Sequence, residues 1–197
     1  MKPDYRKITQ VINYIAFNND GSHRLPELKA IKLIWAADRY HLRKYARTVT
    51  GDNYVAMGKG PVGSSTKDII EFETNYENIT DENLEYIKKY IKFEQENDAA
   101  YTTAIADTDM EELSETDKEA LSFALRNFGK MSKEEIIEFT HLYPEWKIHE
   151  AELKETRRVV PIDMLDFFKD PDGIEHDPFN IPQDILETTK ELYEEYA

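Results

Sequence analysis

The sequence predicts a mainly α-helical protein with a small β-hairpin (α+β): a compact multi-helix domain plus a C-terminal helical extension. Three observations support this fold class. Apolar residues recur at helical spacing along most of the chain, and serine or threonine stands where several periodic segments begin. One short segment rich in β-branched and aromatic residues, followed by a glycine-rich bend, is typical of paired strands. Prolines after residue 160 divide the remainder into short helical pieces.

Two helices and a hairpin are expected in the first third. Apolar residues at i, i+3, i+4 and i+7 from Ile8 predict an amphipathic helix over about residues 5–18. Pro26 suits the first turn of a second helix, whose apolar stripe continues for about twenty residues to Tyr45. A strand over residues 54–57 and a tight bend at Gly58–Val62 then predict the hairpin.

Helix start and stop signals organise the next hundred residues. Ser64 and Ser65 are candidate caps of a short helix near residues 67–72, and Thr80 caps a helix that continues through Ile91. Residues 101–106 favour a short strand, with a helical turn as the alternative. Further signals are Ser114 as a cap, Gly129 as a left-handed terminator, Ser132 to Glu135 as a capping box, and a helix end before Pro144.

The C-terminal part has a different character. The segment Asp170 to Gly173 is a strong turn, and a final helix is expected after Pro182. We expect one side of that helix to carry Ile185, Thr189, Leu192 and Tyr196, while its glutamates lie elsewhere on the helix surface. This tail either docks on the protein's own core or waits for a partner.

Composition sets the class and the location. The chain has 197 residues, of which 40% are hydrophobic and 33% charged, enough apolar material for a packed core. We expect residues 1–150 to form one domain and residues 151–197 an acidic, proline-interrupted extension. No segment reaches the roughly 20 apolar residues of a membrane span, and the N-terminus lacks a signal peptide's apolar region. We therefore expect a cytoplasmic protein without membrane contact.

Cysteine and charge exclude further classes. The chain has no cysteine, which excludes disulfides, thiolate catalysis and cysteine-ligated zinc. Its net charge of −15 is uneven: residues 1–67 hold 12 basic and 5 acidic side chains, and the other 130 hold 13 and 35. The acidic part favours a basic partner and repels nucleic acid, while the basic part could contact phosphate or an acidic protein. Alternatively, the acidic part covers the basic part within one fold.

Catalytic motifs are present only as fragments. His149-Glu150 lacks the second histidine of a zinc protease, and the glycine-rich bend lacks the order of a phosphate-binding loop. Asp38 and His41 lie three residues apart on one helix and could share a proton or a metal, although a structural role is more common for such pairs. We expect no catalytic residue, no metal site and no cofactor, and a protein that is not an enzyme.

Several segments together resemble a known family. Lys32–Tyr45, Thr50–Met57 and Gly60–Val62 follow one another as in the Panacea domain family, which includes SocA-like antitoxins and phage-associated GepA-like proteins. The likeness continues to Thr140–Trp146 and so covers roughly residues 5–150. Many relatives have glycine where this chain has Ala46. Because alanine resists the left-handed conformation, we expect the second helix to run further here.

The resemblance implies a bacterial or phage antitoxin that neutralises a cognate protein toxin by direct binding. It implies no catalytic residue. One alternative is an adaptor that delivers a partner protein to a protease, with the region after Ala151 as its tether. A less favoured alternative is a nucleic-acid-binding regulator that uses the basic first third. The oligomeric state stays open.

Polar residues around the helix–hairpin junction are the candidate site. They either lock this junction or face the toxin, and we expect the locking role for Asp38, Arg47 and Asp52, since turns and helix ends need such partners. We take the junction as the partner-binding surface. Its candidate residues are Asp38, Arg39, His41, Arg43, Arg47, Asp52 and Lys59.

Overall fold

The computed structural model describes residues 3–73, 79–156 and 158–196, and it confirms the mainly helical class with a small β part. The α-helices are α1 (Tyr5–Asn18), α2 (Glu27–Tyr45), α3 (Ser64–Ile70), α4 (Asp81–Tyr90), α5 (Glu115–Phe128), α6 (Lys133–Thr140), α7 (Pro144–Lys147), α8 (Glu150–Thr156) and α9 (Gln183–Tyr196). Two short 3-10 helices are η1 (Met110–Glu112) and η2 (Met164–Phe168).

Within the described residues, the strands form two antiparallel three-stranded sheets. They are β1 (Arg24–Pro26), β2 (Tyr54–Met57), β3 (Gly60–Gly63), β4 (Ile91–Glu96), β5 (Ala99–Ala104) and β6 (Val160–Pro161). One sheet has the order β1-β5-β4 and the other β3-β2-β6. The predicted hairpin is β2–β3, with Val55 opposite Val62, and β6 adds to its free side with Val160 opposite Ala56. The hairpin is therefore joined to a segment about a hundred residues further along the chain.

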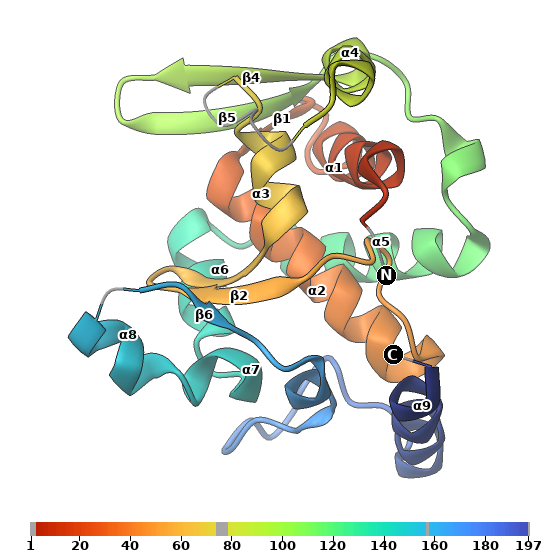
Figure 1. Ribbon diagram of the computed structural model, residues 1–197, viewed down its shortest axis with the longest axis vertical. Coiled ribbons are helices and arrows are strands. Elements are labelled where there is room, and N and C mark those ends of the chain that lie inside the picture. The colour runs from red at the N-terminus through yellow and green to blue at the C-terminus, as the bar shows by residue number, and fades with distance from the viewer. Residues whose placement is uncertain (1–2, 74–78, 157, 197) are drawn as a thin grey trace.

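Helix α2 is the central element (Figure 1). Helices α1, α5, α6 and α9 and strand β3 all contact it. Thirteen of its nineteen residues are buried, including charged ones, so the helix is enclosed on nearly all sides instead of being amphipathic. The indole ring of Trp35 lies with its centroid 5.2 Å from the ring of Tyr143 and 5.5 Å from that of Phe179. This enclosure places α2 at the centre of the core.

The C-terminal segment packs on the same core. Phe167, Phe179 and Leu186 are buried together with the apolar residues of α1, α2 and α5. Helix α9 therefore docks on its own protein. This confirms the first of the two alternatives for the C-terminal tail, docking on the core. The division into a domain of residues 1–150 and an extension of residues 151–197 stays a prediction. Across the three described ranges, no helix is long and apolar enough to cross a membrane.

Buried contacts hold the β2–β3 hairpin from the side of α2. The Nζ of Lys32, fully buried on α2, donates a hydrogen bond to the carbonyl of Pro61 at 2.6 Å. Burial lowers the pKa of Lys32 to about 7. The indole of Trp146 donates to the carbonyl of Met57 at 2.7 Å. Gly60 has φ of +105°, and a Cβ there would lie 2.8 Å from the Lys32 Nζ, so both conformation and space require glycine.

Three predictions about how helices end are wrong. Ile91 begins strand β4 and does not continue α4, because β4 pairs with β5 along its whole length. Gly129 ends α5 in the right-handed region, with φ of −60°, and not in the left-handed one. Helix α2 does not run past Ala46: this alanine itself adopts the left-handed conformation, with φ of +58°, and its N–H bonds the carbonyl of Leu42.

The four residues expected on one side of α9 are divided in the structure, because Thr189 is buried and the other three are exposed. Leu186 and Thr189 are the buried residues of the helix, and Tyr193 is half-buried. Ile185, Leu192 and Tyr196 are exposed. Two apolar stripes overlap on this helix, and the one beginning at Leu186 packs on the core.

Candidate functional site

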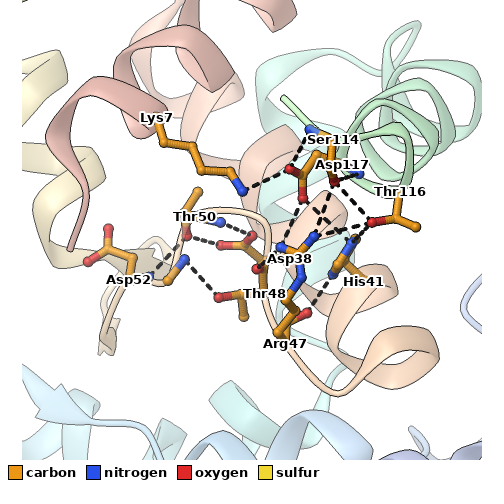
Figure 2. Close-up of polar contacts among 11 residues, drawn as sticks. Lys7, Asp38, His41, Arg47, Thr48, Thr50, Asp52, Ser114, Thr116 and Asp117 are labelled. Carbon is orange, nitrogen blue, oxygen red and sulfur yellow. Dashed lines mark hydrogen bonds and ion pairs between the residues drawn. The ribbon is translucent and has the colours of Figure 1, made fainter. Parts of the chain in front are cut away.

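The candidate site surrounds the loop between α2 and β2, residues 46–53, which we call the junction loop (Figure 2). Side chains from α1, α2 and α5 converge on it. The loop leaves α2 through the left-handed Ala46 and turns again at Gly51, whose φ is +65°. The N–H of Gly51 donates to the hydroxyl of Thr48 at 2.9 Å. Its shape depends on side chains that accept hydrogen bonds from the loop backbone.

Asp38, fully buried on α2, ties the middle of the junction loop to the helix. Its Oδ1 accepts from the backbone N–H of Thr50 at 3.0 Å, and its Oδ2 accepts from the Thr50 hydroxyl and, at 2.8 Å, from the Tyr54 hydroxyl. Burial raises the pKa of Asp38 to about 6, while the hydrogen bonds from Thr50 and Tyr54 act in the opposite direction. These contacts confirm the expected locking role of Asp38.

Asp52 ties the end of the loop to helix α3. Its Oδ1 accepts from the N–H groups of Asn53 and Ser65 at 2.8 and 2.9 Å, and its Oδ2 accepts from Thr66 N–H at 2.7 Å. Two of these donors lie in the first turn of α3, so Asp52 acts as the cap of that helix from outside it. The predicted caps, Ser64 and Ser65, are wrong: α3 has no side-chain cap of its own at its start.

His41 lies fully buried between the junction loop and α5. Its Nδ1 is 2.6 Å from the carbonyl oxygen of Arg47, which can only accept, so Nδ1 carries the proton. Its Nε2, 3.0 Å from the Thr116 hydroxyl, therefore accepts. Burial lowers the pKa of His41 to about 4, although the hydrogen bond to Arg47 favours the charged form. The ring is neutral near pH 7 and has a structural role in this geometry.

Asp117, at the start of α5, faces two cations. The Lys7 Nζ from α1 lies 2.8 Å from its Oδ2, and the Arg47 Nη1 from the junction loop lies 3.0 Å from its Oδ1 (Figure 2). Its backbone N–H and carboxylate also form a capping box with Ser114. Burial alone would raise the pKa of Asp117, but the bonds from Lys7 and Ser114 outweigh it and lower the pKa. The carboxylate thus joins α1, the junction loop and α5.

Arg39 and Arg43 point away from the junction loop and hold the C-terminal segment. The buried Arg39 guanidinium pairs with Glu145 at 2.6 Å and donates to the carbonyl of Lys169 at 2.7 Å. Arg43 donates to the carbonyls of Phe167 and Phe179 at 3.1 and 3.2 Å. It also pairs with Asp170 at 2.5 Å. Both arginines are fully buried, so their charge serves internal packing instead of an outside partner.

The structure thus separates the seven candidate residues into three places. Asp38, His41, Arg47 and Asp52 meet around the junction loop, Arg39 and Arg43 lie against residues 167–179, and Lys59 lies alone in the bend between β2 and β3. Only Arg47 and Lys59 are exposed, and the Arg47 side chain is 44% exposed. Binding of a partner at this surface stays a prediction.

The proposed pairing of Asp38 with His41 has no counterpart in the contacts. Asp38 bonds Thr50 and Tyr54, whereas His41 bonds Arg47 and Thr116. Within the described ranges, no three or more His, Cys, Asp or Glu side chains come together as metal ligands would. Sequence reasoning missed Asp117, although the spacing Ser114-x-x-Asp117 is that of a capping box and could have identified it.

A hollow of about 660 Å³ opens beside the junction loop. We call it the junction hollow; it is lined by the junction loop, by Asp4 and Lys7 of the N-terminal region, and by Met164, Tyr193 and Tyr196 of the C-terminal segment. Figure 1 shows the start of α1, the end of α2 and α9 meeting in this part of the molecule. The hollow therefore lies between the junction loop and the aromatic side chains of Tyr193 and Tyr196.

Comparison with known proteins gives one match. The model of the family described as "Antitoxin SocA-like, Panacea domain" matches residues 31–147, more than half of the chain. No curated protein and no solved structure matches the chain. The matched range runs from α2 to α7 and contains the junction loop and the β2–β3 hairpin. It leaves out α1, the extension and therefore α9.

Proposed function

The chain belongs to the antitoxin SocA-like, Panacea domain family, and from this we propose that it is the antitoxin of a toxin–antitoxin pair, neutralising a cognate protein toxin by direct binding in the cytoplasm. The observation that carries the proposal is the family match over residues 31–147, which spans the central helix and the junction loop. The match establishes the antitoxin family. The existence of a cognate toxin and its neutralisation by direct binding are what we propose for this chain.

Two features of the chain support binding in preference to catalysis. The ionisable groups of the site are committed to structure: Asp38, His41 and Asp117 each bond backbone or side-chain groups of the protein. The surface is acidic, since residues 68–197 hold 35 acidic and 13 basic side chains. An acidic surface accelerates association with a basic partner and selects against acidic ones. We propose, accordingly, that the protein is not an enzyme.

Among the candidate residues, we propose that Arg47 and Lys59 are the ones that touch the toxin. The other five are buried and act by shaping the surface. Lys59 has no structural bond among the contacts described and can be tested cleanly by Lys59→Ala. Arg47 pairs with Asp117, so Arg47→Ala also loosens the junction loop, and Arg47→Lys, which keeps the charge, serves as its comparison.

Co-expression with the protein encoded by the neighbouring reading frame tests the function. The expected result is that this neighbour alone arrests growth, that the antitoxin restores growth, and that the two proteins co-purify in a fixed ratio. Continued arrest together with no complex would contradict the proposal.

The lifetime of the neighbour in cells separates direct neutralisation from delivery to a protease. Direct neutralisation leaves the lifetime unchanged or longer, because the complex protects both chains from proteolysis. A shorter lifetime in the presence of the antitoxin, abolished by removing cellular proteases, would favour the adaptor function instead.

A further inference from the structure

Helix α9 carries an apolar stripe that its own protein does not cover. The side chains of Ile185, Leu192 and Tyr196 are 39%, 44% and 78% exposed. Their spacing of seven and four residues places them on one face of the helix. At 1.5 Å per residue the stripe is about 16 Å long. Apolar side chains that are exposed next to one another, unlike singly scattered ones, are a feature of interaction surfaces.

The exposure is not the result of a loosely attached helix. The hydroxyl of Thr189 donates to the carbonyl of Arg43 at 2.7 Å, and Leu186 is buried beneath the helix. The ring of Tyr193 packs against Phe168 with centroids 5.8 Å apart. Turning the helix to bury Leu192 would expose Leu186 and break the Thr189 bond. The stripe therefore faces solvent directly beside the buried face of the helix, because Thr189, Tyr193 and Leu186 lie about 40–100° around the helix from Ile185.

The stripe continues into the junction hollow. Tyr196 is the last residue of the stripe and also lines the hollow, together with Tyr193, Met164 and the junction loop. The two basic side chains near the hollow, Lys7 and Arg47, both pair with Asp117. The apolar stripe and the junction hollow therefore form one continuous surface. A large side chain at the end of a bound helix would fit into the hollow.

Charge indicates which partner fits. Helix α9 has five acidic residues and one basic residue, Lys190, which is engaged with Glu194 at 3.9 Å. At 100° per residue, Asp184, Glu191 and Glu195 fall along one border of the stripe, on the side away from the core. These carboxylates are exposed. A complementary partner presents apolar side chains in a helical stripe, bordered by lysine or arginine.

We propose that the apolar stripe of α9, together with the junction hollow, is the docking surface for a basic amphipathic helix of the toxin. The identity of the occupant as a toxin rests on the proposed function; the surface and its chemistry do not. The family match ends at residue 147, so α9 lies outside it. This chain therefore selects its own toxin partly through residues that the family model does not contain.

Two full-length variants test the surface. The test variant is Ile185→Arg combined with Leu192→Arg, which replaces the apolar stripe with charge that repels a basic helix. The matched control is Ile105→Arg combined with Ile148→Arg, at exposed apolar residues away from α9 with exposed fractions of 52% and 56%. Thermal unfolding establishes that both variants are folded. Affinity for the purified neighbouring gene product is then measured by calorimetry.

The expected result is that the test variant binds at least tenfold more weakly than wild type while the control binds within twofold of wild type. Equal binding by the test variant, or an equal loss in the control, would overturn the proposal even though the toxin–antitoxin function would stand.

If the neighbouring gene product does not bind wild type, the proposed function fails, and a second probe decides the docking surface by itself. This probe is a synthetic 18-residue helix of leucine and lysine with the complementary stripe, titrated at low salt while backbone amide NMR shifts are recorded. Shifts concentrated on α9 and the junction loop, absent in the test variant, support the surface. Shifts elsewhere, or none, overturn it.

Discussion

Replacing Asp52 with alanine removes the carboxylate that caps α3 and leaves three backbone N–H groups without their acceptor. These N–H groups belong to Asn53, Ser65 and Thr66, and the last two are in buried hydrogen bonds. A buried donor left unsatisfied costs about 1–3 kcal/mol, and part of the loss is recovered by water at the more open Asn53. We expect Asp52→Ala to lower the free energy of unfolding by about 3 kcal/mol.

A second substitution, at Gly63, tests whether the position of the Asp52 carboxylate is the reason for the loss of stability. A Cβ at Gly63 would lie 2.6 Å from the Asp52 Oδ2, yet the backbone there, at φ of −71°, suits alanine. Gly63→Ala should therefore cost about 2 kcal/mol in wild type, because the carboxylate must leave its place and loses bonds to α3. In the Asp52→Ala background the carboxylate is gone and only the Thr66 hydroxyl, 3.1 Å from the new Cβ, has to shift, so the cost should be small. The expected coupling energy is about 2 kcal/mol.

Equilibrium unfolding of the four proteins in guanidinium chloride, followed by the fluorescence of Trp35 and Trp146, measures both quantities. The slope of free energy against denaturant should be alike in all four if the native and unfolded states stay comparable. Additive effects, with Gly63→Ala costing the same in both backgrounds, would refute the argument that this glycine is required by the Asp52 carboxylate. We further expect Asp52→Ala to weaken toxin binding, because the junction loop loses its support.

Three further predictions concern other parts of the chain. Ala46→Gly should raise the free energy of unfolding by about 0.5–1 kcal/mol, since glycine relieves the left-handed strain at this residue, and an unchanged denaturation midpoint would contradict this. The pKa of Lys32 is about 7 in the folded protein, below its value of about 10.4 in the unfolded chain, so the unfolded state binds more protons between these values. The free energy of unfolding of the wild type should therefore rise from about pH 7 to pH 10. Unfolding of Lys32→Met, measured over the same pH range, should lack the share of this rise that is due to Lys32. An equal slope in both proteins would show that Lys32 is not its source. Arg43→Met should cost about 3 kcal/mol and make residues 160–196 sensitive to limited proteolysis, because the carbonyls of Phe167 and Phe179 lose their donor; protection equal to wild type would show that Arg43 does not hold the segment.

Elements with strong local signals were predictable. The capping box at Ser132 and Glu135 and the cap at Ser114 both appear as expected, because each needs only residues within one helical turn. Strand β4 was not predictable in the same way. Its residues continue the apolar spacing of α4, and only pairing with β5, the next strand, makes them extended.

The candidate site shows the same division. The polar residues of the junction could be selected from the sequence, and the locking roles of Asp38 and Asp52 are confirmed by their hydrogen bonds. The sequence could not predict that the side chains of Arg39 and Arg43 point toward the C-terminal segment, because their acceptors include main-chain carbonyls more than 120 residues away. Every residue has a main-chain carbonyl, whatever its side chain, so no sequence pattern predicts which carbonyl accepts such a bond.

The sequence by itself determined the helical class, the hairpin, the family and the uneven charge, since these follow from local spacing, turn chemistry and residue type. The tertiary structure decided which charges are buried and which apolar stripe of α9 stays exposed. Both stripes satisfy helical periodicity equally well. The position of α2 selects between them, because it places the Arg43 carbonyl where Thr189 can reach it, and so leaves Ile185, Leu192 and Tyr196 facing solvent.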